Sequence, residues 1–86
     1  MKATNALKQQ LRWQCRRGML ELDLFLQPFL DDRFSGLSQE EQLDFQRLLM
    51  ESDPTLFTWL TARETPEDPK FAAIIGQLRQ HAQPHA

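Results

Sequence analysis

Several features are scarce in this sequence of 86 residues. Its one cysteine, Cys15, rules out an internal disulfide and a multi-cysteine zinc site. Its three glycines, at positions 18, 36 and 76, are too scattered to form a loop around a nucleotide phosphate. Its most apolar stretch, Met19 to Leu30, is too short to span a bilayer and contains acidic residues. We therefore expect a soluble, cytoplasmic protein that inserts into no membrane and holds no cofactor stably.

Acidic residues are absent from the first 17 positions, a feature that the formal net charge of -2 conceals. That segment carries five basic residues and is +5, whereas residues 18–86 carry five bases and twelve acids and are -7. A basic start can indicate a nucleic-acid arm or a mitochondrial presequence. The acidic remainder argues against nucleic-acid binding, and the lack of serine and of a following linker argues against a presequence. We interpret the segment as the first helix.

The length fits one small domain covering residues 1–86, with the ends 1–3 and 80–86 expected to be mobile. Hydrophobic residues make up 41% and charged residues 26%, as in ordinary globular proteins. A chain of this size buries only roughly 60 to 65% of its unfolded surface. We therefore expect its function to lie on its surface.

Apolar residues are spaced as in helices almost throughout, and no segment shows the alternation of a strand. Leu7, Leu11 and Cys15 form one stripe on a first helix that Thr4 or Asn5 could cap. The stretch from Met19 to Leu30 is too rich in apolar residues for one face, which is typical of a helix surrounded on most sides. Within it, a proline at position 28 is expected to kink the helix or loosen its preceding turn.

Three further helices are predicted by their start signals. Ser38 and Glu41 have the spacing of a capping box. Asp53 and Asp68 are each followed by proline, which favours an N-cap at the aspartate. The residues expected to face inward from these helices are Phe45, Leu48, Leu49, Leu56, Phe57, Trp59, Leu60, Phe71, Ile74, Ile75 and Leu78. The sequence thus predicts an all-α protein, a small bundle of five helices in a single domain.

No set of residues indicates an enzyme or a metal centre. His81 and His85 have the spacing of a metal pair, but Pro84 lies between them and no third ligand is near, so a solvated tail is favoured. The same tail is a poor place for a catalytic base. Arginines beside Cys15 could lower the pKa of its thiol, but the residue also completes the apolar stripe, which favours a buried structural thiol.

One segment is harder to explain by stability alone. Arg17 and Glu21 are four residues apart and could pair on a continuous helix. However, Gly18 lies between them, and a glycine inside a helix costs about 1 kcal/mol relative to alanine. A glycine at this place favours the close approach of another backbone or of a flat ligand.

The residues around this glycine carry a family resemblance. The segment consists of Trp13, any residue, Cys15, Arg16, Arg17, Gly18, Met19, any residue, Glu21, Leu22 and Asp23. It is followed in order by Pro28-Phe29, Leu37-Ser38 with Glu41, Phe45, Leu48-Leu49, Asp53-Pro54, Leu56-Phe57 and Trp59-Leu60. This pattern, over roughly residues 7 to 62, resembles the SdhE-type FAD assembly factors, also called succinate dehydrogenase assembly factor 2. Beyond Pro66 the chain matches only in character.

The resemblance implies a small helical chaperone of the bacterial cytoplasm, monomeric and not itself an enzyme. Its partner would be the flavoprotein subunit of succinate dehydrogenase, and in some bacteria that of fumarate reductase, whose covalent attachment of FAD it promotes. The implied partner-binding residues are Arg17, Gly18 and Glu21 at the centre, with Arg16, Asp23 and Trp13 beside them. The alternative is a regulatory interaction module similar to an antitoxin.

Overall fold

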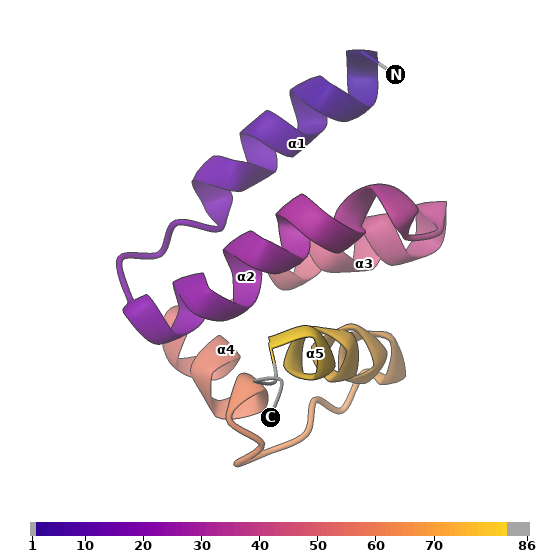
Figure 1. The fold of residues 1–86 in the computed structure, drawn as a ribbon. Helices are drawn as coiled ribbons and strands as arrows, with labels where there is room; N and C mark the ends of the chain where they lie inside the picture. Colours follow the sequence, from indigo (N-terminus) through magenta and orange to yellow (C-terminus); the bar gives the residue numbers. More distant parts are fainter. Residues whose placement is uncertain (1, 83–86) are drawn as a thin grey trace.

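The computed structural model describes the backbone of residues 2–82 and the side chains from residue 6 onward (Figure 1). In order, its elements are α1 (Lys2–Gln14), α2 (Leu20–Arg33), the short 3-10 helix η1 (Phe34–Gly36), α3 (Gln39–Leu48), α4 (Asp53–Leu60) and α5 (Pro69–Ala82). The prediction of five helices is confirmed, and the described residues include no strand.

Helix α2 lies at the centre of the bundle. It contacts α1, η1, α4 and α5, and Figure 1 shows α1 on one side of it with α4 and α5 on the other. Its inward residues Leu22, Leu26 and Phe29 are almost completely buried. The expectation of a helix surrounded on most sides holds only in part, because Leu20 and Leu24 remain 69% and 59% exposed on its outer face.

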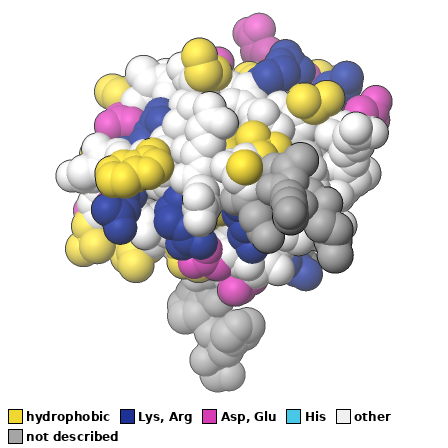
Figure 2. Space-filling view, turned by 90° about the horizontal axis from the view of Figure 1, so that it is seen from above, with side chains coloured by type: hydrophobic (Ala, Val, Ile, Leu, Met, Phe, Trp, Pro, Cys, Tyr) yellow, Lys and Arg dark blue, Asp and Glu magenta, His cyan; other side chains and the backbone are white. Residues whose placement is uncertain are grey.

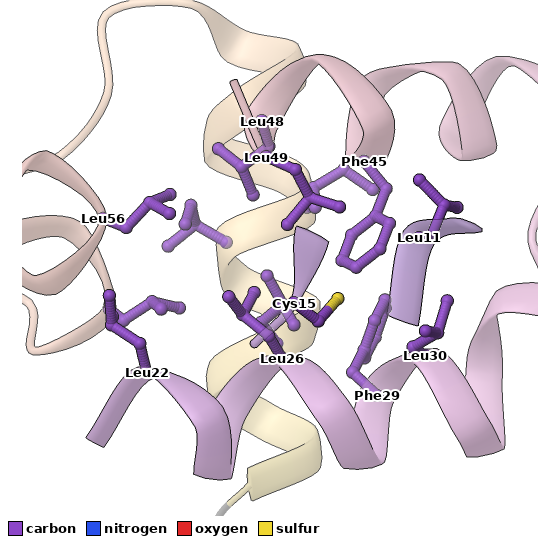
Figure 3. Close-up of a cluster of buried hydrophobic side chains, with 14 of the residues drawn as sticks. Leu11, Cys15, Leu22, Leu26, Phe29, Leu30, Phe45, Leu48, Leu49 and Leu56 are labelled. Atoms are coloured by element: carbon purple, nitrogen blue, oxygen red, sulfur yellow. The ribbon is translucent and has the colours of Figure 1, made fainter. Parts of the chain in front are cut away.

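The core is formed where all five helices meet (Figure 3). Figure 3 shows Leu11 of α1 and Cys15, the residue that follows α1, beside Phe29 and Phe45. The rings of these two phenylalanines have centroids 5.5 Å apart, within the range of favourable aromatic pairs. Phe45 has no exposed surface, and burying such a side chain contributes about 1.5 to 3 kcal/mol. The inward residues predicted for α3, α4 and α5 all lie in this core or against it.

Two of the predicted helix starts are confirmed. The Ser38 amide donates to Glu41 Oε1 over 2.9 Å, and the Glu41 amide donates to Ser38 Oγ over 3.1 Å, which completes the capping box of α3. At α5 the Lys70 amide donates to Asp68 Oδ1 over 2.9 Å. Both helices therefore begin where side-chain oxygens replace the missing backbone partners.

The other two predicted starts are wrong. Helix α1 begins at Lys2, so Thr4 and Asn5 lie inside it rather than at its cap. Helix α4 is capped by Ser52, whose Oγ accepts from the Thr55 amide over 3.4 Å, and Asp53 is its first residue. Because the serine takes the capping role, the Asp53 carboxylate is available for a contact with another part of the chain.

The two terminal helices include residues of both ends that we expect to be mobile. Helix α5 reaches Ala82 and α1 begins at Lys2, while the mobility of these ends stays a prediction. His81 lies on α5, with its Nε2 3.1 Å from Asp32 Oδ2 and its ring nearly perpendicular to that of Phe29 at a centroid distance of 5.9 Å. It is therefore packed rather than part of a solvated tail, whereas His85 lies outside the described residues.

Membrane insertion was not expected, and this can be checked for the helices that the structure describes. None of them is long and apolar enough to cross a membrane.

The capping box gives the fold a testable dependence on pH. The hydrogen bond from the Ser38 amide, followed by that from the Gln77 side chain, holds the pKa of Glu41 below its usual value. A depressed carboxyl pKa stabilises the fold above the pKa of the unfolded chain, and this contribution is lost as the pH falls. We expect Glu41→Gln to lose less unfolding free energy than the parent protein between about pH 6 and pH 3 in urea titrations.

The neighbouring Glu40→Gln is the matched control, because Glu40 is exposed and its carboxylate has no hydrogen bond within the described chain. It should keep the pH dependence of the parent. If the unfolding free energies of Glu41→Gln and Glu40→Gln changed equally with pH, the role given to Glu41 would be contradicted.

Candidate functional site

The candidate site is built on the loop of residues 15–19, which joins α1 to α2. Gly18 in this loop has φ +77°, in the left-handed region that favours glycine. Helix α1 has already ended at Gln14, and Gly18 lies in the loop before α2 begins at Leu20. Because no helix runs through this loop, Arg17 and Glu21 do not share a helical face. Both are described, and no hydrogen bond or ion pair joins them.

Arg17 is instead bound by its own chain. Its Nε donates to Asp53 Oδ1 over 2.9 Å, and its Nη2 donates to the Glu51 carbonyl over 2.6 Å. Its Nη1 donates to the carbonyls of Gln14 at 2.9 Å and Leu49 at 3.0 Å. Only 15% of the side chain is exposed. The Arg17 guanidinium is thus surrounded by a carboxylate and three backbone carbonyls of this chain.

Asp23 also holds the loop. Its Oδ1 accepts from the Arg17 backbone amide over 3.0 Å. The carboxylate stands in the first turn of α2, where the helix dipole favours a negative charge. Asp23 therefore fixes the loop to α2, while the Arg17 side chain fixes it to residues 49–53.

Gly18 and Glu21 face outward from this loop. A Cβ placed on Gly18 would have no atom within 4 Å, so the space above its backbone is open. Glu21 is exposed, and the described residues form no hydrogen bond to its carboxylate. These two residues of the predicted centre are thus available for an outside contact.

Trp13, near the end of α1, and Arg16, in the loop, are both exposed and lie close together. The Trp13 side chain is 72% exposed, and the Arg16 guanidinium lies 5.5 Å from the centroid of its ring. Together with Gln9 and Arg12 they line a shallow hollow of about 280 Å³. Figure 2, which looks down on this side, shows a row of basic side chains with apolar and acidic side chains beside it.

Gln9 and Arg12 were not predicted as site residues. A signal for them was present, because Gln9 and Arg12 are spaced from Trp13 and Arg16 as neighbours on the helix face opposite the Leu11 stripe. Arg12 has a second role, since its Nη2 lies 2.7 Å from Asp31 Oδ1 on α2.

Cys15 takes no part in this surface. Its side chain is completely buried, and burial raises the pKa of its thiol to about 12, although the nearby Arg17 opposes the change. A thiol with such a pKa carries almost no thiolate at neutral pH and is a poor nucleophile. The prediction of a buried structural thiol is confirmed.

Two hollows of the described surface are poorly suited to a flavin dinucleotide. The hollow beside Trp13 is open and small for such a ligand. A second hollow of about 530 Å³ on the outer face of α2 is lined by Asp23, Asp31 and Asp32, whose charges would repel a diphosphate. Within the described residues, no group of three potential ligands could hold a metal ion.

Comparison with known proteins places the chain in a family. Residues 9–82 match the model of the family described as the flavinator of succinate dehydrogenase. The chain belongs to this family. The match includes α5, so the family region extends past Pro66, where the sequence pattern had resembled it only in character.

Several curated relatives of this family are similar over almost the whole chain. A protein of Shewanella oneidensis named FAD assembly factor SdhE is 47% identical over 75 residues, which cover 87% of this chain and 92% of that protein. Proteins of the same name from Coxiella burnetii and Vibrio vulnificus are 43% and 42% identical, covering 84% and 91% of this chain and 88% and 91% of theirs. These names describe an assembly factor, as the resemblance implied.

The left-handed backbone at Gly18 can be tested by its effect on stability. An L-residue in this conformation is destabilised by about 1 to 2 kcal/mol, so we expect Gly18→Ala to lower the unfolding free energy by this amount in urea titrations.

Gly36→Ala is the matched control. Gly36 is also exposed with open space around it, but its backbone is not left-handed, so alanine should be neutral or stabilise the fold slightly. If Gly18→Ala and Gly36→Ala changed the unfolding free energy equally, the left-handed backbone at Gly18 would not be the cause of the loss.

Proposed function

We propose that this protein promotes the covalent attachment of FAD to the flavoprotein subunit of succinate dehydrogenase, by binding that subunit through the loop at Gly18. Membership of the flavinator family and the names of the relatives support this role. The flavoprotein subunit of fumarate reductase is a second client in bacteria that contain it.

The observation that carries the proposal is the exposed pair formed by Gly18, on a loop held from both sides, and Glu21, in the first turn of α2. The open space above Gly18 allows the backbone of a client to approach closely. Glu21, with no partner for its carboxylate within the described chain, is placed to accept hydrogen bonds from that client. A surface fixed before contact loses little conformational entropy on binding.

The role of this chain in the reaction is positioning. The client supplies the FAD and the accepting histidine, and the docked loop holds the immature client so that the two are aligned. Correct alignment of reacting groups can supply a large part of a rate acceleration without any catalytic side chain. This division leaves the chemical step to the client and its FAD.

Arg16 in the loop and Trp13 near the end of α1 extend the docking surface toward α1. Tryptophan and arginine are the residues that most often dominate binding energy at interfaces. The stacking of Arg16 on the Trp13 ring leaves a flat apolar group beside a positive charge. We infer that the facing region of the client contains an apolar recess with acidic residues at its edge.

Loss of the outward carboxylate should reduce flavinylation. We expect Glu21→Ala, co-expressed with the flavoprotein subunit in cells lacking the native assembly factor, to give markedly less covalent flavin fluorescence on a denaturing gel. Gly18→Val should have a similar effect, because its side chain occupies the space needed by the client backbone.

Glu64→Ala is the control for charge, since Glu64 is also an exposed glutamate but lies between α4 and α5, away from the loop. Undiminished flavinylation by folded Glu21→Ala and Gly18→Val proteins would exclude the loop as the docking site. Recovery of a toxin or cytoskeletal protein instead of the flavoprotein in pull-downs would favour the antitoxin-like alternative.

The charge of the α1 surface should set the salt dependence of binding. We expect Arg16→Glu to weaken binding to the purified flavoprotein subunit and to reduce the effect of ionic strength on the affinity, because an attraction is replaced by a repulsion. Isothermal titration at low and high salt measures both.

Arg79→Glu makes the same change of charge on α5 and should retain nearly the parent affinity. An Arg16→Glu protein that binds like Arg79→Glu at every salt concentration would exclude the surface around Arg16 from the interface.

A further inference from the structure

We propose that Arg17 acts as a positioning residue rather than a client contact, and that Asp53, far away in the sequence, is the anchor through which it holds the docking loop. This proposal rests on the docking role proposed above for Gly18 and Glu21. It adds Asp53 and the turn before it to the residues on which that role depends.

The Arg17 side chain joins two connections of the fold. It starts in the loop of residues 15–19 and ends on residues 49–53, the turn between α3 and α4. The Leu49 carbonyl that it reaches stands at the carboxyl end of α3, where carbonyls lack helical partners and a positive charge is favourable. The guanidinium therefore occupies a site already suited to a cation.

Asp53 fixes the orientation of the guanidinium. Its carboxylate is not needed to cap α4, because Ser52 does so, and it accepts from Arg17 Nε over 2.9 Å. With Nε fixed, the planar group directs its two Nη atoms at the carbonyls of the turn. Arginine has five N–H donors, and four of them are bound here. The group is thus not available for a two-pronged contact with a client.

The anchor acts next to the most flexible point of the loop. Gly18 has little steric restriction, so the loop would sample many conformations without a restraint. The Arg17 side chain and the hydrogen bond from its amide to Asp23 fix the residue just before the glycine. Losing Asp53 should therefore weaken docking although Asp53 makes no contact with the client, because the loop must then be ordered during binding.

The decisive experiment measures Asp53 variants in two ways. We expect Asp53→Ala to accelerate amide hydrogen exchange at residues 16–19 in the free protein and to raise the Kd for the purified flavoprotein subunit about tenfold, as for loss of a charge-assisted hydrogen bond. Asp53→Asn keeps an acceptor oxygen and should restore most of both properties. Unchanged exchange at residues 16–19 in Asp53→Ala would overturn the proposal without reference to any client.

A double-mutant cycle separates positioning from direct contact. If Asp53 acts through Arg17, the Arg17→Ala/Asp53→Ala protein should bind no more weakly than Arg17→Ala alone. If Arg17 touches the client, Asp53→Ala should bind like the parent protein while Arg17→Ala binds weakly, and this result would overturn the proposal. Arg17→Lys adds a second test, because lysine keeps the positive charge but lacks the planar group with several fixed donors. This variant should also bind weakly.

Ser38→Ala controls for a general loss of stability, since it removes a side-chain hydrogen bond at the opposite end of α3. It should lower the unfolding free energy and leave the Kd unchanged. An equal rise in Kd for Ser38→Ala and Asp53→Ala at equal stability would refute a specific anchor. Failure of the parent protein to bind the flavoprotein subunit would instead refute the proposed function.

Discussion

The hydrogen bonds of Arg17 are the constraint on which the candidate site depends. Helices of a small bundle are held by burial of apolar side chains, which specifies distances but is not directional. A charge-assisted hydrogen bond is directional, and the Arg17 guanidinium makes four, three of them to the far turn. The core therefore brings α2 and α4 together, and the guanidinium sets how the loop beside them is presented.

The helices could be predicted closely from the sequence because the apolar core depends on local patterns, whereas the loop depends on the hydrogen bonds of Arg17. The apolar spacing in α5 and the Ser38 capping box are local patterns, and each leads to one helix and one start. The helix ends were harder, because Ser52 and Asp53 are both good capping residues and adjacent in the chain. Which of the two caps α4 depends on Arg17, which lies in another part of the sequence and donates a hydrogen bond to the Asp53 carboxylate.

The candidate site could be predicted in its position but not in its internal organisation. Gly18 indicated a special backbone, and the resemblance placed the function around it. Glu21 was the expected partner of Arg17, because it is the nearest acidic residue in the sequence. Its spacing of four residues is that of neighbours on one face of a helix. The real partner is 36 residues away, and only the packing of α4 against α2 brings it within reach.

The bridge between positions 17 and 53 also has a consequence for the evolution of this chain. A lysine at position 17 would keep the charge but could not satisfy the carboxylate and the turn carbonyls together. A neutral apolar residue at position 53 would leave the guanidinium without its orienting partner. The two positions are therefore not free to drift separately, and a substitution at one changes which substitutions the other can accept. The short motif at residues 13–23 thus depends on a residue that lies far beyond its end in the sequence.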